Sequence, residues 1–311
     1  MENENIVICT VCKNSKSSFY ISTNALMHDA NNELYVFNIC ANCETVFLTN
    51  PVAPENLNHY YTENYLPYNG AKAWGKYSSF VENSQKKLDL KRVNFVKKYV
   101  KNKQSNTNVL DVGCGNPSFL KLLHKNLNVN CTGIDFSDTG WNGINYNDIT
   151  LIKVAIKDFN TETLFDVITL WHYLEHDYNP HQTIEKLYNC LIPGGKLIIE
   201  VPDYKSWSAK LQKSHWQGWH SPRHLSLFSK KSFDILFENQ KWHIVKHLRY
   251  GTLDAFTLWW LGKMEKKSIN WSGSMANHFW MLVFLKVITF PIFMFEKLFP
   301  LGIQILVVEK K

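Results

Sequence analysis

The stretch Val109-Leu-Asp-Val-Gly-Cys-Gly115 decides the fold of this 311-residue chain. It has the pattern of a short buried strand that ends in a Gly-x-Gly turn, and residues 118–127 have the apolar spacing of a helix. Short apolar runs predict six more strands at residues 130–136, 149–156, 165–171, 196–201, 242–250 and 303–309. Helices are expected among them, one of which begins at Pro180 and is closed by Gly194-Gly195. The sequence therefore predicts an α/β fold with a doubly wound, Rossmann-like sheet of seven strands.

The carboxyl ends of the first three strands have the chemistry of a nucleoside site. Glycines in a turn allow a ligand to approach the backbone, and open α/β sheets bind their ligands at this edge. Asp111 suits a cationic amine better than a pyrophosphate, and the third glycine of a dinucleotide fingerprint is missing, since Pro117-Ser118 follows the turn. Asp135 ends the second strand and can accept both hydroxyls of a ribose, whereas residues 155–158 end the third strand where an adenine edge would lie.

These ordered motifs, over residues 75–251, resemble the class I S-adenosylmethionine-dependent methyltransferases. The resemblance implies that the glycine turn and its neighbouring acid hold the methionine part of S-adenosylmethionine, and that the second acid holds the ribose. A nucleotide-binding Rossmann fold and an ordinary tight turn are the alternatives. The expected cofactor-binding residues are Asp111, Gly113, Cys114, Gly115, Asp135, Phe136, Ile156, Lys157, Trp171 and His172.

Four of the seven cysteines form two Cys-x-x-Cys pairs, Cys9 with Cys12 and Cys40 with Cys43. The first residues show no secretory signal, so we expect a cytoplasmic, reducing compartment in which paired cysteines bind a metal. Two such pairs can close a tetrahedral four-thiolate Zn(II) site without an open position, which predicts a structural zinc. Four unliganded thiols or two disulfides are the alternatives.

Further motifs resemble a bacterial methyltransferase subfamily with an N-terminal zinc-binding module. They are Cys40-Ala-Asn-Cys43, Val46-Phe47, Asn50-Pro51, Tyr60-Tyr61 with Tyr65, Glu175-His176 and Pro222-Arg223-His224-Leu225. Members are similar to sugar C-methyltransferases and to enzymes of surface-polysaccharide or secondary-metabolite clusters. The resulting domain prediction is a zinc-binding module at 1–50, a Tyr-rich connector or lid at 51–75, a cofactor-binding core at 76–251, a hydrophobic helical insertion at 252–302 and the last core strand at 303–311.

Histidine and arginine residues near the later strand ends are the candidates for the acceptor side. Histidine can take the proton that an oxygen or carbon acceptor loses near neutral pH, and arginine can hold a carboxylate or phosphate. Glu175 is a further candidate for the acceptor side, and each of these residues has the alternative of fixing a turn or a loop. The expected catalytic residues are His176, His220, Arg223 and His224.

The insertion at 252–302 contains a run from Phe279 to Phe295 that is almost wholly apolar. A single membrane crossing would put the last strand on the wrong side of the bilayer, so two interpretations are left. One is an interfacial hairpin in peripheral contact with the cytoplasmic membrane, with Lys263, Lys266, Lys267 and Lys286 at anionic headgroups. The other is a protein-packed cap or a homodimer surface.

The net charge of +7 is mild and scattered, which does not indicate a nucleic-acid partner. Residues 1–50 hold only Lys13 and Lys16 as basic residues, which argues against a zinc-ribbon RNA methyltransferase. The expected activity is methyl transfer to a small-molecule or glycan-type acceptor, such as a nucleotide- or lipid-linked sugar of cell-surface polysaccharide biosynthesis. A quinone or lipid O-methyltransferase at the membrane surface is the alternative, and the intact glycine turn counts against a non-catalytic binding protein.

Overall fold

The computed structural model describes residues 7–28, 33–61, 66, 70–100, 107–141, 146–238 and 241–311. Within these residues the centre is a seven-stranded sheet in the order β10-β11-β8-β7-β4-β5-β6. Its strands are β4 (Asn108–Val112), β5 (Asn130–Asp135), β6 (Thr150–Lys153), β7 (Phe165–Trp171), β8 (Leu191–Pro202), β10 (Trp242–Leu248) and β11 (Ile303–Lys310). The predicted α/β fold with a doubly wound, Rossmann-like sheet is confirmed. Tyr65 of the predicted connector lies outside the described residues.

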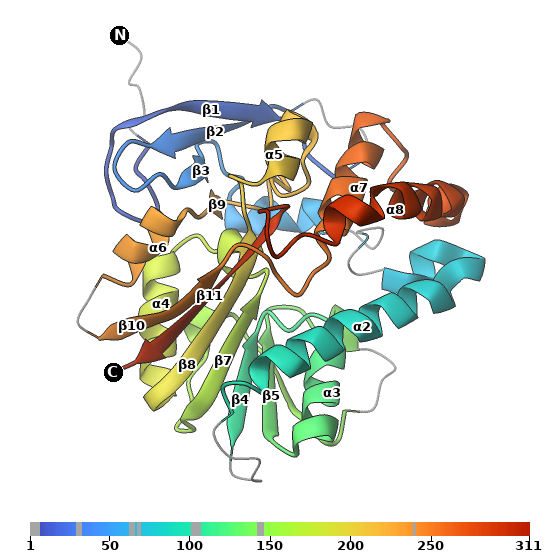
Figure 1. Ribbon diagram of the computed structural model, residues 1–311. Coiled ribbons are helices and arrows are strands. Elements are labelled where there is room, and N and C mark those ends of the chain that lie inside the picture. The colour runs from blue at the N-terminus through green and yellow to red at the C-terminus, as the bar shows by residue number, and fades with distance from the viewer. Residues whose placement is uncertain are drawn as a thin grey trace.

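Strand β4 shows why the chain alternates between strands and helices. Its side chains alternate between two apolar clusters, because Leu110 and Val112 pack with one pair of helices and Val109 packs with another pair. The first pair is α4 (Pro180–Cys190) and α6 (Lys230–Leu236), and the second is α2 (Ser78–Val96) and α3 (Ser118–Leu127). Figure 1 shows the two pairs on opposite faces of the sheet. A strand covered on both faces requires a nearly continuous apolar run.

The strand directions bring the candidate residues to one edge of the sheet. β6, β5, β4, β7 and β8 pair in parallel, whereas β11 pairs antiparallel with both β8 and β10. The carboxyl ends of the parallel strands therefore lie side by side, and this is the edge at which open α/β sheets bind ligands.

The N-terminal module forms a second, antiparallel sheet that the rest of the chain completes. Strands β1 (Ser17–Thr23), β2 (Tyr35–Cys40) and β3 (Val46–Leu48) pair in sequence, and β9 (Ser226–Leu227) joins β3 at the edge. The buried side chains of this sheet pack on Trp216 and Trp219, which come from the segment that follows β8. The module is thus built into the molecule rather than attached by a linker.

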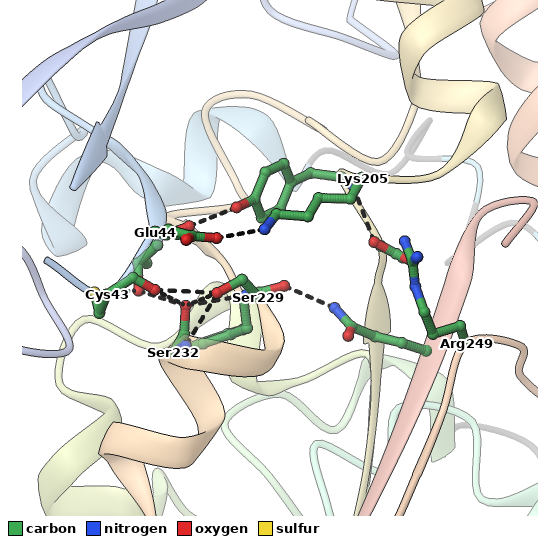
Figure 2. A network of polar contacts seen from close by, with 11 residues as sticks. Cys43, Glu44, Lys205, Ser229, Ser232 and Arg249 are labelled. Atoms are coloured by element: carbon green, nitrogen blue, oxygen red, sulfur yellow. Dashed lines mark hydrogen bonds and ion pairs between the residues drawn. The ribbon is translucent and has the colours of Figure 1, made fainter. Parts of the chain in front are cut away.

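A polar network also links the second cysteine pair to the core, as Figure 2 shows. The hydroxyls of Ser229 and Ser232 donate to the carbonyl of Cys43 at 3.0 and 3.1 Å. Ser229 is the N-cap of α6, so the same side chain satisfies the first turn of that helix. The carboxylate of Glu44 pairs with the Lys205 ammonium. These contacts fix the module against α6 and the end of β8.

The insertion between β10 and β11 is helical, as expected, with α7 (Ala255–Lys266) and α8 (Phe279–Phe293). Figure 1 shows α8 beside α7, at the end of the large sheet where the small sheet lies. Both ends of α8 rest on the protein, since the Phe279 ring stacks on Tyr77 at 3.7 Å and the Phe293 ring lies 5.5 Å from Phe256. The segment Met275–Phe293 is long and apolar enough to span a membrane, and only 11% of its 18-residue apolar window is buried, so it is not a core helix. A helix held at both ends lies along the surface and does not project from it.

Candidate functional site

The turn after β4 leaves its backbone accessible. The Gly113 and Cys114 N–H groups both donate to the Ile134 carbonyl at 2.8 and 3.1 Å, which ties the turn to β5. Gly113 and Gly115 have φ values of +70° and +48°, which disfavour any side chain. A Cβ atom added to Gly115 would meet no atom within 4 Å. The turn therefore leaves open space next to Gly115, as a ligand-cradling loop requires, whereas the Tyr173 ring covers Gly113.

Two buried acids lie next to this turn at the ends of β4 and β5. Asp111 accepts a hydrogen bond from the Thr169 hydroxyl at 2.6 Å, and burial raises the pKa of its carboxyl to about 7. Asp135 accepts from the Gly115 and Ser137 N–H groups at 2.9 and 3.0 Å, and burial raises its pKa as well. A cationic or hydroxyl-bearing ligand would favour the ionised forms of both carboxyls.

The other expected cofactor residues near β5 and β6 have different environments. Cys114 and Ile156 are buried, and Lys157 is exposed. Phe136 follows Asp135 and is 53% exposed, which leaves its ring available to a flat ligand. The Tyr61 ring lies 6.1 Å from that of Phe136 in an edge-to-face arrangement. The connector thus reaches the end of β5.

The end of β7 supplies Trp171 and His172, which are held by charged groups. The Arg92 guanidinium lies 5.0 Å from the Trp171 ring. His172 lies between two buried carboxylates, with Nδ1 3.3 Å from Glu175 and Nε2 3.1 Å from Glu200. Burial lowers the pKa of His172, but its hydrogen bonds with the two carboxylates outweigh this effect and raise the pKa to about 9. His172 therefore carries charge inside the protein and fixes the two acids.

Three further histidines form one cluster after β7 and β8. The His224 ring lies 4.5 Å from that of His176 and 5.0 Å from that of His220. Burial lowers the pKa of all three rings, most strongly for His220 and His224. The structure brings these three predicted residues together, as neutral imidazoles at neutral pH.

Arg223, the fourth residue predicted for the acceptor side, makes contacts of another kind. Its guanidinium donates to the carbonyls of Tyr60 and Leu26 at 2.8 Å each and lies 3.4 Å from that of Met27. The side chain is almost fully buried. These partners favour the structural alternative, in which Arg223 holds the connector and the module beside the histidine cluster.

Sequence reasoning missed several residues of this site. Glu200 is fully buried at the middle of the site and also accepts from the Thr252 hydroxyl at 3.0 Å. Tyr61 lies 3.3 Å from His176 Nδ1, and the Arg223 guanidinium lies 5.7 Å from its ring. An acid inside an otherwise apolar strand could have indicated Glu200, and the paired tyrosines could have indicated Tyr61. Nothing in the helical pattern of α2 distinguishes Arg92.

The four paired cysteines lie close together at the end of the small sheet where Cys40 of β2 is opposite Ser17 of β1. Cys9 Sγ lies 3.4 Å from Cys43 Sγ, and Cys12 Sγ lies 3.3 Å from Cys40 Sγ. These separations are too long for disulfides and close to the roughly 3.8 Å expected between thiolates on a tetrahedral zinc. Each pair lies on its own turn, and the two turns are of the same kind. The Lys13 N–H donates to the Cys9 carbonyl, and the Glu44 N–H donates to the Cys40 carbonyl, each at 3.1 Å. The four sulfurs are placed to hold one metal ion.

Comparisons with known proteins identify the family of the chain. The family described as methyltransferase domain matches residues 81–247, more than half of the chain. A ubiquinone biosynthesis O-methyltransferase of Colwellia psychrerythraea is 32% identical over 104 residues, which cover 30% of this chain and 41% of that protein. The chain thus matches less than half the length of this curated relative.

Solved structures with a similar chain course include two methyltransferases bound to S-adenosylhomocysteine. One is the plantazolicin methyltransferase BpumL with a triazolic desmethylPZN analog, at a TM-score of 0.44 and 16% identity over 79% of this chain and 96% of the other. The other is the N-methyltransferase NodS from Bradyrhizobium japonicum, at a TM-score of 0.42 and 13% identity over 72% and 87% of the two chains.

Proposed function

From the premise that the chain belongs to the methyltransferase domain family, we propose that it is an S-adenosylmethionine-dependent methyltransferase whose acceptor is a lipid-linked sugar presented at a membrane surface. The observation that carries the proposal is the apolar surface of α8, which lies beside the acceptor end of the sheet. The cofactor supplies a methyl group on a sulfonium, and the chain must bind it, align the acceptor and accept a proton.

We assign the cofactor to the edge formed by β4, β5 and β6. Gly115 leaves the backbone of the turn open to a ligand, and the methionine part would lie there, whereas the Tyr173 ring packs against Gly113. Asp135 is already fixed by the Gly115 N–H and has a further lone pair on each oxygen for the ribose hydroxyls. Asp111 lies beneath the turn as the balancing charge for a cation. These placements follow the expectations from the sequence.

We assign the acceptor to the histidine cluster. The segment that carries His176 also touches the glycine turn, because a Cβ atom on Gly113 would lie 2.4 Å from the Tyr173 ring. An acceptor oxygen at the cluster would therefore be close to the methyl donor. Neutral imidazoles can accept the proton that the oxygen loses as the methyl group arrives. Tyr61 lies between the cluster and Phe136 and would separate the two ligands.

The apolar surface of α8 supports an acceptor with a lipid anchor. Trp280, Phe284 and Val287 are 69%, 60% and 69% exposed and lie on one helical face, since they are spaced by four and three residues. Ile288, Phe290, Ile292, Met294 and Leu298 extend this surface. Lys286 does not contribute a free charge, because it pairs with Asp254 at 3.0 Å. Lys266 and Lys267 remain exposed for anionic headgroups.

A liposome assay tests this placement. The variant Trp280→Ser/Phe284→Ser/Val287→Ser removes side chains that each gain about 1.5–3 kcal/mol when they leave water, so membrane binding should be abolished. Leu164→Ser is the matched control, because Leu164 is 45% exposed and directly precedes β7, at the amino ends of the parallel strands and not at the carboxyl ends beside α8. We expect the wild type and the control to sediment with phosphatidylglycerol vesicles, less so at high salt. A monodisperse oligomer that ignores vesicles would identify the α8 surface as a protein interface.

A quinone or lipid O-methyltransferase is the second candidate. The curated relative named for ubiquinone biosynthesis favours it, and it shares the need for a membrane-bound acceptor. Transfer of a labelled methyl group from S-adenosylmethionine to a lipid-linked sugar or to a polyprenylated catechol separates the two. Label in the sugar supports the main proposal, and label only in the catechol replaces it.

We also propose that Cys9, Cys12, Cys40 and Cys43 hold one structural Zn(II). The sulfur separations support this assignment, and four protein ligands leave no position for a substrate. The ion would stabilise the module and, through Cys43, its junction with α6.

A further inference from the structure

We propose that Glu175, His176 and His224 form a second metal site, which binds a divalent cation at the acceptor end of the sheet. One donor atom from each of the three side chains lies within 4.8 Å of the others. The site is separate from the four cysteines and uses ligands of another type. Its existence does not depend on the proposed function, but its role in catalysis does.

The hydrogen bonds of the two histidines leave one ring nitrogen of each available as a ligand. His176 Nδ1 lies 3.0 Å from the Arg223 carbonyl, and His224 Nδ1 lies 2.8 Å from the Gly218 carbonyl. A carbonyl only accepts, so Nδ1 must carry the proton in both rings, and Nε2 keeps its lone pair. Metal-bound histidines usually have their second nitrogen fixed by a carbonyl or carboxylate in this way. His224 Nε2 is directed at Glu175, with 4.0 Å between Nε2 and Oε1.

The carboxylate of Glu175 completes the ligand set. Glu175 is fully buried, and its Oε2 atom has no hydrogen-bond partner among the described residues. Its Oε1 atom faces His172 Nδ1 at 3.3 Å, which orients the carboxylate. Buried carboxylate oxygens require a partner, and a cation held by Glu175, His176 and His224 would supply it. Adjacent donors on such an ion lie about 3–3.5 Å apart, so small side-chain rotations would close the site.

The types of ligand limit the metal ions that the site can bind. Two imidazoles and one carboxylate with open positions suit a divalent transition ion such as Mn²⁺, Fe²⁺ or Zn²⁺. This site has no thiolate ligand, whereas the four thiolates of the cysteine site favour softer metal ions.

The open positions define the acceptor more closely. An acceptor hydroxyl bound to the ion would lose its proton more readily, and a second oxygen on the neighbouring carbon could take another position. The hydroxyl proton leaves to His220 or solvent, the oxygen forms a bond to the methyl carbon, and the bond from that carbon to sulfur breaks to leave a neutral thioether. A vicinal diol of a sugar or a catechol has this arrangement of oxygens.

Titration with Mn²⁺ tests the site directly. Purified, zinc-loaded protein would be titrated with MnCl2 by calorimetry, and free Mn²⁺ would be followed by its electron paramagnetic resonance signal. We expect one Mn²⁺ per wild-type chain, and binding at least about 100-fold weaker in Glu175→Gln and His224→Gln because each loses a direct ligand. His243→Gln is the matched control, since His243 is exposed on β10 and should leave binding unchanged.

Failure of the site and failure of the proposed function give different results. A wild type that takes up no Mn²⁺ at millimolar concentration, or a Glu175→Gln variant that binds it as well as the wild type, would overturn the metal site. Mn²⁺ binding in a chain that methylates neither a lipid-linked sugar nor a catechol would support the site and reject the proposed acceptors. Mn²⁺ should also raise the unfolding temperature of the wild type, a result that requires no variant.

Discussion

Alanine at the two glycines of the β4 turn should have opposite main effects. A Cβ atom on Gly113 would lie 2.4 Å from Tyr173 Cδ2, whereas one on Gly115 would meet nothing within 4 Å. Both residues have positive φ, so either substitution costs about 1–2 kcal/mol of backbone strain. Gly113→Ala adds an overpacking cost of about 1–3 kcal/mol, because the Tyr173 ring must move. We therefore expect losses of about 2–5 kcal/mol for Gly113→Ala and about 1–2 kcal/mol for Gly115→Ala.

Cofactor affinity should not follow this order of stability. The new methyl group of Gly115→Ala would occupy the space that we assign to S-adenosylmethionine, so affinity for S-adenosylhomocysteine should fall at least about tenfold, which corresponds to 1.4 kcal/mol. Urea unfolding gives the stability and calorimetry gives the affinity. A double variant with Tyr173→Ala should recover part of the Gly113→Ala loss, which a double-mutant cycle measures.

Two results would refute this reasoning. Equal destabilisation by the two alanines would mean that the Tyr173 ring does not constrain the turn. Unchanged cofactor affinity in Gly115→Ala would mean that the ligand does not lie over this residue, and the cofactor assignment would have to be moved.

Three further outcomes are expected. Burial raises the Asp111 pKa from 3.8 in the unfolded chain to about 7, so between these pH values the folded state holds one proton more than the unfolded state. The free energy of unfolding should therefore fall as the pH rises from about 4 toward 7. A cationic cofactor favours ionised Asp111, so calorimetric affinity should rise through pH 7 in the wild type and lose this dependence in Asp111→Asn. Cys40→Ser should lower the zinc content measured by elemental analysis, from about one ion per chain, together with the unfolding temperature. His224→Gln should reduce turnover at least about tenfold with nearly unchanged cofactor affinity, as measured by steady-state kinetics and calorimetry; unchanged turnover would assign His224 a structural role.

The sequence predicted the parts of the fold that depend on local pattern. The run around Leu110 is apolar because both faces of β4 are covered, and Gly113 marks the turn because its φ is positive. The cysteine spacing likewise predicted a cluster, because each pair closes a local turn. These features follow from neighbours in sequence, so a pattern can reveal them.

Features set by distant contacts could not be predicted in the same way. The helix that begins at Pro180 was expected to reach Gly194, but it ends at Cys190 because Leu191 pairs with Phe165 of β7. Strand β9 has two residues and forms only because Phe47 lies opposite Ser226. The charged residues His172, Glu200 and Arg92 come from the end of β7, from β8 and from α2. No regular spacing in the sequence connects them.

The N-terminal module, the insertion between β10 and β11 and the loop after β8 contact one another near the histidine cluster, and this arrangement bears on the choice of acceptor. The Glu265 carboxylate, on α7 of the insertion, accepts from the Met27 N–H of the module at 3.1 Å and from the Gln217 side chain at 3.0 Å. Arg223 then joins the segment after Gln217 to the module again through the Leu26 carbonyl. Module, insertion and histidine-bearing loop are therefore mechanically one unit, whereas the turn after β4 is tied to β5 within the common sheet. Loss of the proposed zinc should consequently disturb acceptor methylation before it disturbs cofactor binding, since the proposed acceptor side is joined to the module directly through Arg223 and Glu265.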